Sequence, residues 1–354
     1  MPKGGVSGYS AVHARVRAMY STMLTAEVWA ALYEAPSFAS LINILKDTVY
    51  GPYLLEVEEK ALTPRRAIYQ IKKHLANAYN TVIHLVPEHA QPLLTQLYRL
   101  FEVDNLKAVL RGIVTGASWD QVRYVLFPLG AITVLPAQAM VEAESVGAAV
   151  ELLRGTPYYD TLAHAMERFT AEQSLFPLEV ALDLDYRREL WKDINQLSGR
   201  DREQALHIVG SLIDMDNLMW AIRYRVYHHL SEEEIINYTV PFGYQVRDED
   251  IRAIAAGADI AQVLARVYPD LTDVRSLLEE PRRGLPLLEV RLQKYIVERC
   301  REAFIGYPFH VGIPLAYVVL NELEIQDLTV LVEAKSLRIP VEEFRSHLLM
   351  GCVY

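Results

Sequence analysis

The sequence predicts an all-α protein, and three observations carry that prediction. Apolar residues recur at three- and four-residue steps over long segments, which is the pattern of amphipathic helices. No segment shows the alternation of apolar and polar residues that a half-buried β-strand requires. Two short sequence elements occur three times in the same order, about 110 residues apart, and this period predicts one repetitive body.

The helices can be placed from their apolar steps and their termini. Thr63 is a plausible N-cap and Pro64 suits a first helical position, so a helix is expected to run from there through Tyr79. Two more helices are expected around the stripes Leu100, Val103, Leu106, Leu110, Ile113 and Leu212, Met215, Met219, Ile222, Val226. The segments 127–135 and 238–246 contain proline, glycine and β-branched residues, which favour loops or short strands.

The first recurring element is a leucine that follows an acidic or amide pair and precedes an apolar residue four positions on. It occurs in 101–112, 213–225 and 323–335, where the leucines are Leu106, Leu218 and Leu328. Each leucine follows the one before it after about 110 residues, a long interval for a repeat. The first two copies also share a Pro-apolar-Gly triplet, at 128–130 and 241–243.

The second recurring element is a leucine with an apolar residue or alanine four positions earlier and a tyrosine soon after. Its leucines are Leu45, Leu153 and Leu264, and its tyrosines are Tyr50, Tyr158 and Tyr268. These leucines recur at the same interval as those of the first element, within insertions of a few residues. The six leucines of both elements are expected to pack the repeats. The third copy ends before its second element, whereas the N-terminal segment begins with one.

These spacings predict one domain over residues 1–354 that contains three repeats. Their approximate bounds are 53–160, 161–270, and 271–354 completed by 1–52. Joining the ends in this way leaves no half-repeat exposed, as a closed three-fold arrangement requires. The alternative is chance, because leucine and alanine recur at helical spacing in any helical protein. No stretch is rich enough in glycine and serine to be a flexible linker.

Helix geometry separates packing positions from outward ones. The residue five positions after each repeat leucine lies about 140° around the helix from it, so it points away from the packed stripe. Arg111 and Arg223 occupy that position, whereas the third copy has Glu333 there and Lys335 two positions later. Arg111, Arg223 and Lys335 are therefore candidates for contact with a partner. The polar residues before each leucine, expected to cap a helix end or bond across a repeat boundary, are Asn105, Asn217 and Asp327.

Several function classes are excluded by what the sequence lacks. The net charge of −10 and the absence of a basic cluster argue against nucleic-acid binding, and an acidic second half suits a basic partner protein. No phosphate-binding glycine loop, metal-binding spacing or catalytic motif is present, so we expect no catalytic, cofactor or metal residues and no small-molecule substrate. Carboxylate pairs are plentiful, but catalysis would need them to converge in a pocket.

The compartment is predicted from cysteines and hydropathy. Cys300 and Cys352 are the only cysteines, which favours a cytoplasmic protein with free thiols. The most apolar stretches, 125–137 and 311–320, are too short for a transmembrane helix, which needs about 18 to 20 residues. The first ten residues lack the apolar core of a signal peptide.

The repeated segments and two longer stretches carry a family resemblance. In 306–344 a Pro-apolar stretch leads to Ala-Tyr at 313–317 and is followed by Glu324, Leu328, Lys335 and Ile339-Pro340. This stretch and the opening segment 13–51 resemble the C subunit of the archaeal and bacterial V/A-type rotary ATPases, the relative of the d subunit of the eukaryotic vacuolar ATPase (AC39 family). The resemblance covers essentially the whole chain.

The resemblance implies a funnel of helices with pseudo-three-fold symmetry. It also implies a non-catalytic coupling subunit that forms a socket between the central stalk and the proteolipid ring, in ion transport coupled to ATP hydrolysis or synthesis. Such a protein lies at the cytoplasmic membrane face and contacts the membrane only through the ring. The alternative is a soluble helical scaffold with no rotary motor. A helical terpenoid-type enzyme would need an Asp-rich D-D-x-x-D motif, which is missing.

Overall fold

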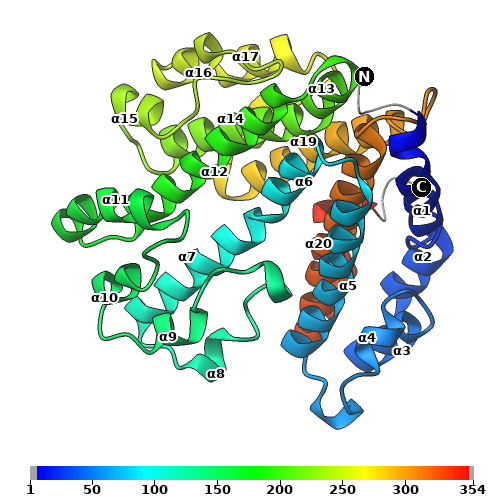
Figure 1. The fold of residues 1–354 in the computed structure, drawn as a ribbon. Helices are drawn as coiled ribbons and strands as arrows, with labels where there is room; N and C mark the ends of the chain where they lie inside the picture. The colour runs from blue at the N-terminus through cyan, green and yellow to red at the C-terminus, as the bar shows by residue number, and fades with distance from the viewer. Residues whose placement is uncertain (1–5, 351–354) are drawn as a thin grey trace. The chain divides into compact units, whose positions relative to one another are not determined.

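The computed structural model describes residues 6–350, and within them the chain forms helices and no β-strand (Figure 1). The all-α prediction is therefore confirmed. The segments 127–135 and 238–246 form loops, the first with a short 3₁₀ turn at Gly130–Ile132. No helix in the described part is long and apolar enough to span a bilayer. Cys300 is buried with a free thiol, and Cys352 lies outside the described residues.

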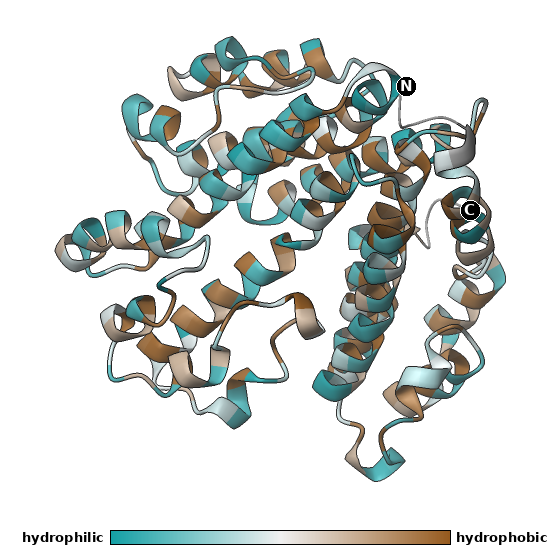
Figure 2. Cartoon of the chain, viewed as in Figure 1, coloured by the Kyte–Doolittle hydropathy of each residue, from teal (hydrophilic) through white to brown (hydrophobic). Residues whose placement is uncertain are grey.

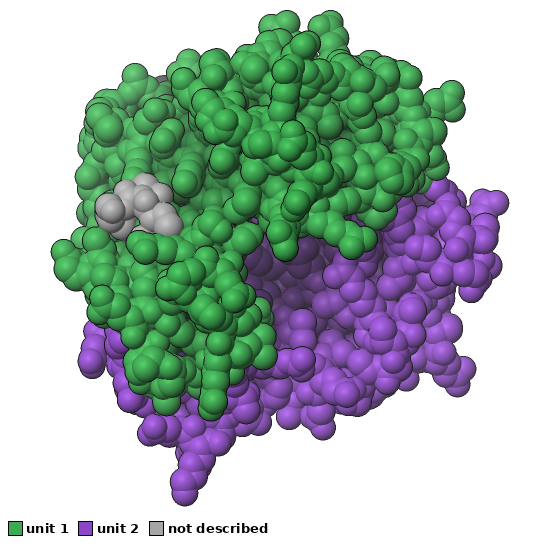
Figure 3. All heavy atoms as spheres, turned by 180° about the vertical axis from the view of Figure 1, so that it is seen from behind, with its two compact units in different colours: residues 1–41, 84–90, 194–354 green, residues 42–83, 91–193 purple. Residues whose placement is uncertain are grey.

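The chain divides into two compact units, coloured separately in Figure 3. Unit 1 comprises residues 1–41, 84–90 and 194–354, and unit 2 comprises residues 42–83 and 91–193. Two helices, α3 (Phe38–Lys46) and α5 (Pro64–Leu85), begin in one unit and end in the other, as does α12 (Phe176–Gln196).

Unit 2 is built around α7, which packs on shorter helices and on α12. Helix α7 spans Leu100–Thr115, and the shorter helices are α4 (Gly51–Leu54), α6 (Gln91–Tyr98), α8 (Trp119–Val122), α9 (Ala137–Val141), α10 (Val146–Glu151) and α11 (Tyr159–Glu172). Its core contains stacked aromatic rings: Tyr79 on Tyr98 with centroids 4.8 Å apart, and Phe101 on Phe127 at 4.1 Å. The second stack places the start of the 127–135 loop on α7.

Unit 1 is built around α14 and α20. Its helices are α1 (Val6–Tyr20), α2 (Ala26–Glu34), α13 (Gly199–Ala205), α14 (Ser211–Val226), α15 (Glu232–Asn237), α16 (Asp248–Ala255), α17 (Ile260–Val267), α18 (Val274–Glu279), α19 (Pro281–Glu302), α20 (Gly312–Leu337) and α21 (Val341–Phe344). A π-helical turn, Leu206–Gly210, joins α13 to α14.

Helix α20 is the most deeply buried element of unit 1. Every residue from Gly312 to Leu320 is buried, which explains why this stretch reads as continuously apolar instead of amphipathic. Glycine at its first residue leaves room for two neighbouring side chains, because a Cβ there would lie 2.6 Å from Oε1 of Gln204 and 2.8 Å from Nδ1 of His310. Pro314 is tolerated because it lies in the first turn, where backbone N–H groups have no helical partner.

Candidate functional site

A buried carboxylate on α7 holds the loop after α8. Oε1 of Glu102 accepts hydrogen bonds from the backbone N–H of Val134 at 2.6 Å and from Oγ1 of Thr133 at 2.8 Å. Its Oε2 accepts a bond from the hydroxyl of Tyr158 at 2.6 Å. Burial raises the pKa of the Tyr158 hydroxyl, and the hydrogen bond to Glu102 raises it further. One side chain therefore fixes two later segments on α7.

A carboxylate on α14 holds the corresponding loop in unit 1. Asp214 accepts bonds from three consecutive backbone N–H groups: Tyr244 at 2.7 Å, Gln245 at 2.6 Å and Val246 at 3.2 Å. Burial raises the pKa of Asp214 to about 6, and the three N–H groups oppose that rise. Gly243 is required here, because a Cβ at this position would collide with Oδ1 of Asp214.

Two carboxylates on α20 bind the N-terminal and C-terminal segments of unit 1. Oε2 of Glu324 accepts a bond from the backbone N–H of Leu24 at 2.9 Å, a contact across 300 residues of sequence. Oδ2 of Asp327 accepts bonds from the backbone N–H groups of Leu349 at 2.8 Å and Met350 at 2.6 Å. Both carboxylates are buried.

Two asparagines make a reciprocal pair with a backbone residue. Asn105 donates to the carbonyl of Phe127 at 2.9 Å and accepts from its N–H at 2.6 Å. Asn217 does the same with Val240, at 2.8 Å and 2.9 Å. An amide can donate and accept at once, so it replaces the strand partner that these backbone groups lack. The two loops consequently need neither a helix nor a sheet to satisfy their buried backbone.

The polar residues on these three helices follow one spacing. Sequence reasoning selects Asn105, Asn217 and Asp327, and Glu324 is among the residues of the family resemblance. It misses Glu102 and Asp214, the carboxylates three positions before the two asparagines. The missed carboxylates recur at the same intervals as the repeat leucines, because each lies four positions before its leucine. That shared period is the signal that could have found them.

The three cations expected to face a partner all have contacts inside their own unit. Arg111 on α7 forms a two-bond ion pair with Glu179 on α12, at 2.6 and 2.9 Å, and its side chain is 61% exposed. Arg223 on α14 pairs with Glu289 on α19 at 2.6 Å. Lys335 on α20 donates to the carbonyl of Tyr33 at 2.7 Å, and burial lowers the pKa of its amine. All three therefore pin one helix of their unit to another.

The leucines of both elements lie in the interior. Their exposed fraction is zero in every case, for Leu45, Leu106, Leu153, Leu218, Leu264 and Leu328. The tyrosine that follows the second element is also buried in each copy: Tyr50, Tyr158 and Tyr268.

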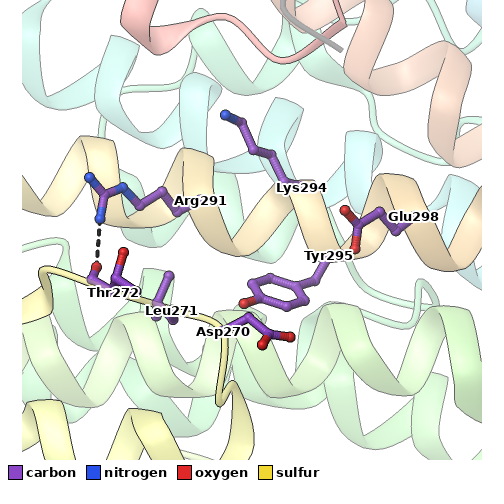
Figure 4. Close-up of a pocket in the computed structure, with 7 residues that line it drawn as sticks. All are labelled: Asp270, Leu271, Thr272, Arg291, Lys294, Tyr295 and Glu298. Atoms are coloured by element: carbon purple, nitrogen blue, oxygen red, sulfur yellow. Dashed lines mark hydrogen bonds between the residues drawn. The ribbon is translucent and has the colours of Figure 1, made fainter.

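A surface cavity of about 280 Å³ lies beside α19 in unit 1 (Figure 4). Its rim mixes charges of both signs, with Arg291 and Lys294 on α19 and Asp270 on the loop between α17 and α18. The Arg291 guanidinium donates to the carbonyl of Thr272 at 2.7 Å, so it braces that loop. Within residues 6–350 no group of three or more His, Cys, Asp or Glu side chains could hold a metal ion. The buried polar groups described above hold backbone, and we assign them no chemistry.

The profile of the ATP synthase (C/AC39) subunit family matches residues 12–347, nearly the whole chain. The chain belongs to this family. Among similar proteins, the A-type ATP synthase C subunit of Methanocaldococcus jannaschii is 26% identical over 96% of this chain and 86% of its own length. The C subunits of the A-type ATP synthases of Desulfurococcus sp. and Thermococcus onnurineus are 28% and 27% identical, each over 97% of this chain and 90% of their own length.

Membership of the C/AC39 family makes the chain a non-catalytic subunit of a rotary ATPase complex. The buried side chains of Glu102, Asp214, Glu324 and the two asparagines hold later or earlier segments of the chain on α7, α14 and α20 through charge-assisted or paired hydrogen bonds.

Proposed function

We propose that this chain is the coupling subunit of its rotary complex, a socket that joins the central stalk to the proteolipid ring. It transmits torque between ATP hydrolysis or synthesis and ion transport, at the cytoplasmic face of the membrane, and meets the membrane only through the ring. Membership of the C/AC39 family over residues 12–347 is the observation that carries this proposal. The absence of a metal-binding cluster in the described residues is compatible with it.

We also propose that the body is a funnel of three repeats, near 53–160, 161–270, and 271–354 completed by 1–52. The element order supports this arrangement. A long helix, α5, α12 or α19, precedes a second long helix, α7, α14 or α20, and a short helix then follows, α8, α15 or α21. In the first two repeats two more short helices follow, α9 and α10 or α16 and α17.

Hydrogen bonds at matching positions support the repeats independently. Asn105 and Asn217 bind backbone 22 and 23 residues downstream, and Asp327 binds backbone 22 and 23 residues downstream as well. The carboxylates three positions before these residues bind backbone at a longer separation, 32 and 30 residues downstream, in the first two repeats. In the third repeat Glu324 instead binds the backbone of Leu24, in the N-terminal segment. This is the contact that an N-terminal segment completing the last repeat would make.

Reconstitution tests the coupling role. The rotary complex is purified from cells that lack this chain, placed in lipid vesicles, and assayed for ATP hydrolysis and ion uptake before and after the purified chain is added. We expect hydrolysis without uptake in its absence, and uptake restored on addition, because torque then reaches the ring. Full uptake without the chain would refute the coupling role. A chain that remains a soluble monomer and binds neither stalk nor ring would instead favour the helical scaffold.

A further inference from the structure

The loop between α19 and α20 presents an apolar turn to solvent. Ile305 is 77% exposed and Tyr307 is 46% exposed, and Gly306 between them adopts a φ of +85° that turns the chain. Figure 2 shows the tip of this loop in brown, and in Figure 1 it is the orange loop beside α1. Single exposed apolar side chains are common on protein surfaces, but here two large ones lie two positions apart on one turn.

The turn is held in one position by aromatic contacts. Phe304 stacks on Tyr20 of α1 with ring centroids 4.3 Å apart, and Tyr307 meets Phe309 edge-on at 5.6 Å. The guanidinium of Arg17 donates to the carbonyl of Phe304 at 2.8 Å. A turn fixed before binding loses little conformational entropy when a partner docks.

Two arginines border the turn without a carboxylate partner in the described chain. Arg17 lies 5.8 Å from the centroid of the Phe304 ring, and Arg200 lies 4.7 Å from that of Tyr307. The acid next to Arg200 in sequence, Asp201, accepts bonds from the hydroxyl of Tyr9 at 2.8 Å and from the N–H of Val311 at 2.9 Å.

The acid on the other side of the loop is also engaged, because Glu302 contacts Nε2 of His207 at 2.9 Å. The chain as a whole carries a net charge of −10. Arg17 and Arg200 therefore place two exposed guanidinium groups beside the turn, one near Phe304 and one near Tyr307.

We propose that another protein of the complex binds this turn. The residues that make the contact, named here the turn patch, are Ile305, Tyr307, Arg17 and Arg200. The matching surface has an apolar recess for Ile305 and Tyr307 and carboxylates for the arginines. Tyrosine and arginine are enriched at the residues that contribute most to protein–protein binding. An anionic membrane is less suited, since recognition of its surface uses clusters of about four to eight basic residues. The proposal rests on the proposed function, because the partner is a subunit of the rotary complex.

Binding of variants to the complex purified without this chain tests the turn patch. We expect Ile305→Asp to raise the dissociation constant at least tenfold, because it places a carboxylate in the recess and beside the partner's own carboxylates. Arg200→Glu should weaken binding similarly at low salt and less at high salt. Both variants should keep the wild-type helix content and unfolding midpoint.

Leu152→Asp is the matched control. Leu152 is 45% exposed beside Arg154, which lies 4.6 Å from the ring of Tyr159 but is already paired with Glu151 at 2.6 Å. The control should bind within twofold of wild type. Wild-type binding together with equally tight binding of Ile305→Asp overturns the turn patch and leaves the proposed function intact, whereas failure of the wild type to bind overturns both. Ile305-dependent binding to phosphatidylserine vesicles alone would overturn the protein partner in favour of a lipid surface.

Discussion

Replacing Asn217 with aspartate tests the pair of hydrogen bonds between this side chain on α14 and the backbone of Val240. Asn217 is 3% exposed and exchanges two hydrogen bonds with the backbone of Val240. An ionised aspartate can still accept from the N–H of Val240 but cannot donate to its carbonyl. Two oxygens would then face each other at the present 2.8 Å, in a site with little water to screen them.

Protonation of the new aspartate sets an upper limit on how much unfolding free energy the variant loses. A protonated aspartate restores the missing donor, so the destabilisation cannot exceed the free energy of protonating a carboxyl with an ordinary pKa. At pH 7 that limit is about 4 kcal/mol, and at pH 5 it is about 1.5 kcal/mol. Because an uncompensated buried charge costs several kcal/mol, the variant should lie near the limit and lose about 3 to 4 kcal/mol at pH 7.

The pH dependence provides the sharper test. The fold raises the pKa of the new carboxyl above its ordinary value of about 3.9. The destabilisation is therefore absent below that pH and grows as the pH rises from the ordinary pKa to the raised one. Urea unfolding of wild type and variant at pH 5 and pH 7 measures the two differences. The exposed Asn195→Asp is the control, and its free energy of unfolding should change by under about 0.5 kcal/mol. If the free energy of unfolding falls by less than about 1 kcal/mol at pH 7, or if the loss is not smaller at pH 5, the two hydrogen bonds of Asn217 do not stabilise the fold as argued.

Three further predictions concern packing, an ion pair and pH. Leu218→Ala should lower the free energy of unfolding by about 2 to 5 kcal/mol, because the leucine is fully buried, and a negligible change would contradict its packing role. Arg111→Met should change the free energy of unfolding by under about 1 kcal/mol, since its ion pair with Glu179 is exposed. It should weaken binding to the complex if the arginine faces a partner, and unchanged binding would remove it from the interface. Burial lowers the pKa of His74 to about 4, so the unfolded chain binds its proton first as the pH falls, and stability is lost below about pH 6.5. Between pH 8 and pH 5 that loss is about 2 kcal/mol, and His74→Phe should remove it from the measured pH profile.

The sequence predicts the helices better than it predicts their contacts. The apolar stripe through Leu106 places a helix correctly because helical periodicity is a local property of the chain. The same reasoning turns Arg111 outward, and its side chain is indeed largely exposed. It cannot find Glu179, 68 residues away, because no local pattern records which helix packs alongside.

The positions of the buried polar side chains can be predicted from the sequence, but their hydrogen-bond partners cannot. Asn105 stands out because a polar residue at the edge of an apolar stripe needs a hydrogen bond, yet its partner lies in a loop with no periodicity. Glu102 escapes notice because one acid on a helix is ordinary. Only the common spacing of Glu102, Asp214 and Glu324 makes it distinctive.

The two Pro-apolar-Gly triplets show that the same sequence motif can be required for different structural reasons. Gly130 adopts a φ of +67° and has no neighbour where a Cβ would lie, so its backbone conformation selects glycine. Gly243 has no such φ and is selected by the closeness of Asp214. Asp214 is one carbon shorter than Glu102, so its loop must approach α14 more closely, and the glycine provides the space. The length of the acidic side chain therefore decides why glycine is needed in the loop. Asp214→Glu should be tolerated less well than Glu102→Asp, because the longer side chain has no room beside Gly243.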